Sequence, residues 1–365
     1  MDRVARIQAF VETIWDWYSA NKRTLPWRDL KNVDPAERAY KVMVSEIMLQ
    51  QTQVSRVKIV FKDFLERFPS IQVLAQASNR EVLMAWRGMG YNGRALRLRD
   101  AARVIIERYG MSNEKLAISN CRKIANCSSL IANFPSSMES LQNIPGIGHY
   151  TAAAIRNFAF NIPTPCLDTN IRRILHRTFV GPENSDGTWK KDDTYLLKLA
   201  GEILTVATKM RNAEPFDKAQ DRCGIRNIPC DTANWHAALM DFGSLIQTKR
   251  NPNWDACPLT DKKLMKTTPA LWKKIPHSAF RIPNSLKEPG RLVGTKYIPN
   301  RIFRGKVIEE LRDTAEGMKL DMIGKRVCID WSPKAHKDWL EGITQKLVQE
   351  RMVQVQRGRY RLFEG

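Results

Sequence analysis

Apolar residues recur every three or four positions over most of the first hundred residues, and this period constrains the fold more than any other feature. It is the spacing of one face of an α-helix, whereas strand-like alternation is scarce in the same region. Two such faces are formed by Ile7, Phe10, Val11, Ile14 and Trp15, and by Val42, Met43, Ile47 and Val54. The sequence therefore predicts a body that is nearly all α-helical.

The chain is strongly basic, with 59 Lys and Arg against 38 Asp and Glu and a net charge of +21. Such an excess points to a polyanionic partner, with nucleic acid the first candidate and an acidic membrane surface the second. A basic but otherwise ordinary enzyme is the alternative.

Cellular context is suggested by what the sequence lacks. No apolar run has the length of a signal peptide core or a membrane span, and the seven cysteines are odd in number and irregularly spaced. We therefore expect a soluble, cytoplasmic, monomeric protein with reduced cysteines.

The composition changes along the chain and suggests three parts. Residues 1–261 form the helical domain, with polar insertions near 111–133 and 211–232. Residues 262–298 read as a basic linker, because the stretch from Lys262 to Lys306 holds twelve Lys or Arg and one acid, Glu288. The linker either follows the phosphate backbone of DNA or is a solvated tether. Residues 299–365 show helical spacing followed by two short alternating strands, which predicts a small winged-helix-like α+β module.

A glycine turn lies between two helical patterns at IPGIGHYTAAAI, residues 144–155. Gly146 and Gly148 lack a Cβ that would block a close approach, and a helix begins directly behind them. Helix, tight turn, helix is a geometry that directs free backbone N–H groups at a phosphate. Ser136 and Glu139 match a capping box for the preceding helix. A Gly-x-Gly turn alone is a weak signal.

Two carboxylates occupy opposite predicted environments. Glu46 lies mid-helix with no basic residue three or four positions away, so apolar flanks should raise its pKa and keep it protonated. Asp168 precedes a short helix, where capping bonds and the helix dipole should keep it ionised. Such a divergent pair is typical of acid–base catalysis. The alternatives are a surface glutamate and a purely structural cap.

Further segments occur together with the hairpin, in the same order as in one family. They are LPWR at 25–28, SEIMLQQTQV at 45–54, GMGYNGRALRL at 88–98 and LDTNIRRIL at 167–175. With these motifs, residues 8 to 260 resemble the helix-hairpin-helix DNA glycosylases, and QQTQ resembles especially the adenine-mismatch glycosylases of the MutY family. The resemblance implies a two-lobed, all-α glycosylase body.

The resemblance also implies roles for individual residues. Glu46 would protonate the adenine ring and handle the attacking water, and Asp168 would stabilise the deoxyribose cation. Gln51 and Tyr91 match residues that wedge into the gap left by the extruded base. The residues that match positions around that base are Trp27, Arg28, Thr52, Tyr150, Asn170 and Asp241. Without the family, Trp27 and Tyr91 would be read as core aromatics.

The chain departs from the family in three places. Relatives usually hold an iron–sulfur cluster with four cysteines, but Gln247, Trp254 and Lys263 occupy three of these positions and only Cys257 remains. One thiolate cannot hold a four-iron cluster, so we expect no cofactor and no metal. Cys121, Cys127, Cys223 and Cys230 fit no common zinc spacing. Residues 299–365 are too short for the MutT-like domain of many relatives, and Thr169 replaces their glycine.

The function predicted is hydrolysis of the N-glycosidic bond of adenine mispaired with guanine or 8-oxoguanine in duplex DNA. Some relatives carry a lysine at Tyr150 that cleaves the strand, so this chain should be monofunctional. The alternatives are a G·T mismatch thymine or uracil glycosylase of the same fold, and a non-catalytic DNA-binding protein.

Overall fold

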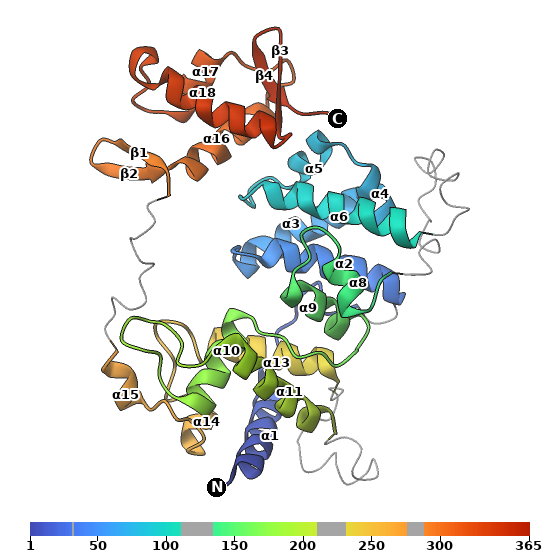
Figure 1. The fold of residues 1–365 in the computed structure, drawn as a ribbon, viewed down its shortest axis with the longest axis vertical. Coiled ribbons are helices and arrows are strands. Elements are labelled where there is room, and N and C mark those ends of the chain that lie inside the picture. Colours follow the sequence, from blue (N-terminus) through green and yellow to red (C-terminus); the bar gives the residue numbers. More distant parts are fainter. Residues whose placement is uncertain (31–32, 111–133, 210–230, 276–287) are drawn as a thin grey trace. The chain divides into compact units, whose positions relative to one another are not determined.

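The computed structural model describes residues 1–365 apart from 31–32, 111–133, 210–230 and 276–287. Both predicted insertions lie almost wholly outside the described residues, as do Cys121, Cys127, Cys223 and Cys230. The described chain is mostly helical, and its two sheets are small antiparallel pairs (Figure 1). The all-α fold class with a small α+β end is therefore confirmed. No described helix is long and apolar enough to cross a membrane.

The chain forms two compact units, and each is built from segments distant in sequence. Unit 1 contains Met1–Pro35, Ser136–Gln142 and Ile147–Ile282. Unit 2 contains Ala36–Pro135, Asn143–Gly146 and Pro283–Gly365. The predicted domain boundaries at 261 and 298 stay predictions.

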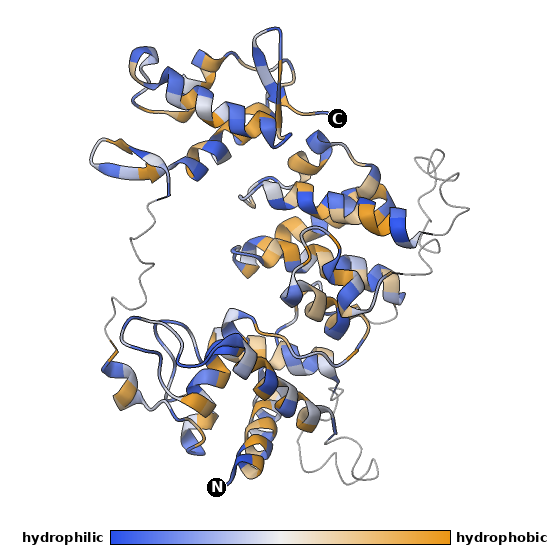
Figure 2. Ribbon diagram, in the orientation of Figure 1, coloured by the Kyte–Doolittle hydropathy of each residue, from blue (hydrophilic) through white to orange (hydrophobic). Residues whose placement is uncertain are grey.

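All the regular secondary structure described in unit 1 is helical. Its helices are α1 (Arg3–Asn21), α8 (Met138–Gln142), α9 (His149–Ala159), α10 (Thr169–Leu175), α11 (Asp193–Lys209), α13 (Thr232–Leu245), α14 (Pro258–Asp261) and α15 (Pro269–Lys273), with a π-helical turn η2 (His176–Val180) after α10. The predicted apolar face of α1 is buried, and Phe10 and Trp15 pack on Trp235 of α13. Both hydrophobic and hydrophilic residues occur along the length of α1, as expected of an amphipathic helix (Figure 2).

Unit 2 begins with five helices and ends with the C-terminal module. The helices are α2 (Pro35–Leu49), α3 (Val54–Arg67), α4 (Ile71–Gln76), α5 (Asn79–Ala85) and α6 (Gly93–Tyr109). The later elements are β1 (Gly290–Val293), β2 (Lys296–Pro299), α16 (Asn300–Arg312), α17 (Leu320–Val327), α18 (Pro333–Gln349), β3 (Val353–Gln356) and β4 (Arg359–Leu362). The three helices α16, α17 and α18 are followed by the β3–β4 hairpin, and Met318 forms an isolated bridge to Tyr360 of β4. This order of elements is the winged-helix-like arrangement.

The C-terminal module packs against α5 and α6 within unit 2. Leu83 and Leu96 belong to the same buried cluster as Val307 and Leu340 of the module. Buried Arg312 of α16 donates to the carbonyl oxygen of Leu83 at 3.0 Å. The region predicted as a linker has local structure where it is described, because it contains α15 and the β1–β2 hairpin.

The predicted capping box before the hairpin is wrong by one residue. The hydroxyl of Ser137, rather than that of Ser136, accepts from the backbone N–H of Ser140 at 3.0 Å at the start of α8. The carbonyl of Ser136 instead accepts a hydrogen bond from Arg156 of α9. This long-range partner draws Ser136 away from the capping position.

Candidate active site and DNA-binding turns

Asp168 is the N-cap of α10, as its place in the sequence predicts. One carboxylate oxygen accepts from the backbone N–H of Ile171 at 2.6 Å, and the other accepts from the Asn170 amide at 2.7 Å. Burial raises the pKa of Asp168, whereas the bonds from Ile171 and Asn170 and the charge of Arg173 act to lower it. The sequence led us to expect that the capping bonds would dominate and lower the pKa. Instead desolvation has the larger effect, and the capping bonds and neighbouring charge only oppose it.

Asn170 is itself held in place by Arg173 and by the close approach of α13. Its side-chain oxygen accepts from Arg173 at 2.7 Å, and Arg173 also donates to the carbonyl oxygen of Gly243 at 2.8 Å. A Cβ at Gly243 would lie 2.6 Å from the Cβ of Asn170, so only glycine fits there. The amide that contacts Asp168 is thus fixed on both sides.

Asp241 ties the LPWR segment to α13. Its side chain is fully buried and pairs with Arg23 at 2.7 Å and with Arg28 at 2.8 Å. Trp27, which lies between these two arginines in the sequence, is also buried, with 6% of its surface exposed. Sequence reasoning found Trp27, Arg28 and Asp241 but missed Arg23, whose signal is a second basic residue just before LPWR.

Glu46 belongs to unit 2 and lies on the inner face of α2. It is buried, with 6% of its surface exposed, and Val42, Met43 and Ile47 of the same helix are buried as well. The alternative of a surface glutamate is therefore wrong. Burial of a carboxyl group on a helix interior is a costly placement that functional sites commonly retain.

Gln51 and Tyr91 both lie in turns and share an unusual backbone conformation. Their φ angles are 56° and 47°, and both side chains are exposed. Positive φ is uncommon for residues other than glycine and clusters at sites that hold ligands. The alternative that Tyr91 is a core aromatic is wrong, because 48% of its surface is exposed.

Arg94 joins these two turns, and sequence reasoning missed it as well. Its buried guanidinium donates to the carbonyl oxygens of Ile47, Met48, Gln50, Met89 and Gly90, and to the hydroxyl of Thr52 at 2.9 Å. The first three carbonyls lie at the C-terminal end of α2, where helix carbonyls lack intrahelical partners. Burial lowers the pKa of Arg94 to about 10. The sequence GMGYNGR contains this arginine, but a buried arginine and a surface one look alike there.

The glycine turn between α8 and α9 has the expected backbone. Gly146 has a φ of +86°, and Gly148 is the N-cap of α9. Tyr150, in the first turn of α9, is half-buried and packs against the core of unit 1. Arg97 of α6 lies beside Gly146, since a Cβ there would meet the Arg97 side chain at 3.5 Å.

The four positions that the family resemblance assigns to cluster ligands hold Gln247, Trp254, Cys257 and Lys263 in this chain. The thiol of Cys257 is buried and accepts from the Gln247 amide at 3.4 Å. The Gln247 oxygen in turn accepts from Arg177 at 3.2 Å, and Trp254 packs on Trp272 with ring centroids 6.2 Å apart. Among the residues that the structure describes, no group of three or more His, Cys, Asp or Glu could hold a metal ion.

Comparison with known proteins places the chain in a family. Residues 44–193 match the model of the HhH-GPD superfamily base excision DNA repair proteins. An adenine DNA glycosylase of Mycolicibacterium smegmatis is 30% identical over 300 residues, which cover 82% of this chain and 78% of that enzyme. The mouse adenine DNA glycosylase is 31% identical over 259 residues, which cover 70% of this chain but only 41% of that enzyme.

A solved structure supports the same fold. A thermostable thymine-DNA glycosylase superposes with a TM-score of 0.51 at 24% identity, over 74% of this chain and 98% of that one. The chain belongs to the HhH-GPD superfamily of base excision DNA repair proteins, and within it to the family of the adenine DNA glycosylases.

Proposed function

We propose that this protein excises adenine from duplex DNA where the adenine is mispaired with guanine or 8-oxoguanine. The observation that carries the proposal is the pair of family-matched carboxylates in contrasting settings. Glu46 is buried in α2, and Asp168 is a helix N-cap that accepts hydrogen bonds from Ile171 and Asn170.

In the proposed mechanism the two carboxyl groups act in turn. Glu46 donates a proton to the adenine ring, so that the bond between C1′ and the base nitrogen breaks and its electron pair leaves with the neutral base. Asp168 stabilises the deoxyribose cation through its negative charge. Water then adds to C1′ and gives its proton to the Glu46 carboxylate, which restores the acid.

The adenine must leave the helical stack before this chemistry can occur. Gln51 and Tyr91, presented on the turns that Arg94 joins, would fill the gap. Around the extruded base we place Trp27, Arg28, Thr52, Tyr150, Asn170 and Asp241. The salt bridge from Arg28 to Asp241 would hold the LPWR turn in position for this contact.

Sequence-independent affinity would come from the phosphate backbone. The backbone N–H groups at Gly146 and Gly148 would bind a phosphate, and the net charge of +21 favours DNA as the partner. The segment 262–298 would add further phosphate contacts. Truncation after residue 261 should then weaken binding and flatten its salt dependence.

A panel of duplexes tests the proposal and its alternatives. Wild-type protein is incubated with duplexes that carry A·8-oxoG, A·G, T·G or U·G, and the released base is measured. Release of adenine supports the proposal, release of thymine or uracil alone would establish the alternative activity, and release of none would mean a non-catalytic DNA-binding protein.

The assignment of the acid needs its own variant. Glu46→Gln keeps the shape but cannot donate the proton, so single-turnover excision should fall by roughly 10²-fold or more while binding persists. Glu37→Gln on the same helix is the matched control, because Glu37 forms an ion pair with Lys41, four residues away, at 2.6 Å. Near-normal excision by Glu46→Gln would refute the assignment.

The proposed reaction stops at an abasic site. Tyrosine has no amine to form a Schiff base, so Tyr150 would leave the strand intact and borohydride should trap little enzyme on DNA. Tyr150→Lys should gain some trapping and strand cleavage. Efficient trapping by the wild-type protein would refute the monofunctional assignment.

A further inference from the structure

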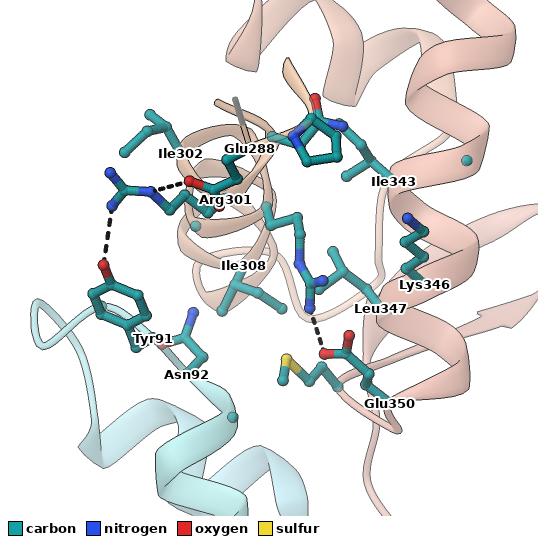
Figure 3. A pocket seen from close by; sticks show the side chains of 18 of the residues that line it. Tyr91, Asn92, Glu288, Arg301, Ile302, Ile308, Ile343, Lys346, Leu347 and Glu350 are labelled. Carbon is teal, nitrogen blue, oxygen red and sulfur yellow. Dashed lines mark hydrogen bonds and ion pairs between the residues drawn. The ribbon is translucent and has the colours of Figure 1, made fainter. Parts of the chain in front are cut away.

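A cavity of about 790 Å³ opens within unit 2 between the turn at residues 89–93 and the C-terminal module (Figure 3). Its floor is apolar and consists of buried side chains from α16, α18 and the segment after α18, namely Ile308, Ile343, Leu347 and Met352. A volume between about 300 and 1,000 Å³ with a mostly apolar lining and a few polar groups is characteristic of ligand sites.

Two glycines line this cavity from different helices. Gly305 lies within α16 and Gly342 within α18, and a Cβ added at either would have no heavy atom within 4 Å. Glycine within a helix is less favourable than alanine, and no close packing explains it here.

The rim of the cavity is cationic. Arg301 pairs with Glu288 at 2.7 Å and Arg304 pairs with Glu350, so four of the lining charges are matched. In the part of the chain that the structure describes, Arg97 and Lys346 have no ion-pair partner, and Asp338 has none either. With Arg97 and Lys346 against Asp338, the unmatched charge of the lining is therefore positive. Arg97 is also the residue beside Gly146 of the proposed phosphate-binding turn.

The cavity also adjoins a side chain with a proposed role on DNA. The Arg301 guanidinium donates to the Tyr91 hydroxyl at 3.1 Å, and both residues line the opening (Figure 3). If Tyr91 enters the duplex, neighbouring nucleotides lie at this opening. The C-terminal module therefore presents its apolar floor and its free lysine to the same DNA.

We propose that this cavity is a second nucleotide-binding site, which holds one nucleotide of the bound duplex. The base lies against the apolar floor and its flanking phosphates contact Arg97 and Lys346. The inference rests on the proposed function, since it takes DNA as the substrate, and it assigns the C-terminal module a direct role in binding it.

Filling the cavity tests the site. Full-length Gly342→Leu should bind an A·8-oxoG duplex at least tenfold more weakly than wild type, with a melting temperature no lower than that of wild type, because leucine favours the helix more than glycine does. Ala335→Leu, at an exposed position of the same helix away from the cavity, should bind like wild type. Equal affinity of the two variants would overturn the proposal.

Photocrosslinking gives a test that needs no variant to fold. 5-Iodouracil is placed at one position after another in both strands of the duplex, and the crosslinked peptides of the wild-type protein are identified. At least one position should crosslink within residues 300–308 or 338–352. Absence of such a crosslink from every position would overturn the proposal.

The salt dependence of binding tests the rim. Arg97→Gln and Lys346→Gln should each reduce the slope of log K against log salt by about one, because each removes a phosphate contact. Lys198→Gln, at an exposed position of α11 in the other unit, is the control. Slopes no different from the control would contradict the cationic rim.

These results can be separated from a failure of the proposed function. If the wild-type protein releases no base, the proposed function fails whatever the cavity does. If it releases adenine while the cavity variants bind normally, only the second site is rejected.

Discussion

Each unit contains a deeply buried arginine, and the two are held in different ways. Arg177 in unit 1 pairs with buried Glu183 at 2.9 Å, donates to Gln247, and lies 4.0 Å from the centroid of the Trp272 ring. Arg94 in unit 2 directs its hydrogen bonds to five carbonyl oxygens and one hydroxyl. One guanidinium faces a carboxylate, and the other faces only neutral acceptors in these bonds.

From this difference we infer that Arg177 stabilises the fold as a structural clamp, whereas Arg94 supports function by positioning two turns. A carboxylate neutralises Arg177, so this group can stabilise the region around Gln247 and Cys257. Neutral acceptors leave the charge of Arg94 uncompensated, and its hydrogen bonds hold two exposed turns that carry Gln51 and Tyr91. Near a polyanion, an uncompensated charge of this kind favours binding.

The largest effect should come from breaking the Arg177 clamp. Arg177→Met leaves the Glu183 carboxylate buried and unpaired, which should lower the free energy of unfolding by about 3–5 kcal/mol. The double variant with Glu183→Met should recover most of the loss, because no charge then remains to be desolvated. Urea unfolding measures both, and a double variant as unstable as the single would contradict the clamp.

Breaking the support at Arg94 should affect activity more than stability. Arg94→Met should slow single-turnover excision by about 10²-fold, because loss of positioning by about 1 Å has that effect on a catalytic geometry. The excision rate of Arg94→Lys should lie between those of the wild type and Arg94→Met, since an ammonium group keeps the charge but cannot reach all of the acceptors. Arg99→Met is the control, because buried Arg99 of the same helix bonds Asn79 and Asp100. Equal loss of excision in both methionine variants would indicate a general effect on the fold.

Asp168 allows the same comparison of function and stability within one residue. Because burial raises its folded-state pKa, the folded protein holds that proton more tightly than the unfolded chain does. The ionised carboxylate is therefore unfavourable for folding above its unfolded pKa. Asp168→Asn, which retains an N-cap side chain, should be at least as stable as wild type at pH 7 while excision falls by about 10²-fold or more.

The pH dependence checks the sign of this effect. Below the unfolded pKa of an aspartate the side chain is protonated in both states, so any stability gain of Asp168→Asn should vanish there. Asp231→Asn, at the N-cap of α13, is the matched control and should excise normally. A destabilised Asp168→Asn at pH 7 would show that its cap bonds outweigh burial.

The smallest expected effect concerns the iron content of the purified protein. Since Arg177, Gln247 and Cys257 form a hydrogen-bonded chain where relatives place ligands, anaerobically purified protein should contain no stoichiometric iron and no visible absorption of a cluster. A four-iron cluster would contradict our assignment of residues 247–263.

The sequence by itself determined the helical class, the hairpin glycines and the family-matched carboxylates, because these depend on local period, turn chemistry and motif order. The N-cap role of Asp168 was predictable, because a capping hydrogen bond joins residues no more than about four positions apart in the sequence. Burial of Glu46 was predictable from the apolar face of its own helix.

Only the tertiary structure decided the roles of the buried arginines and of the C-terminal module. Arg94 finds acceptors as far as 47 residues away in sequence, and Arg312 reaches Leu83 across 229 residues. Nothing local distinguishes such an arginine from one on the surface, because its burial depends on which distant carbonyls the fold brings near. The cavity beside Tyr91 has the same origin: its walls come from segments that are more than 190 residues apart and meet only through packing.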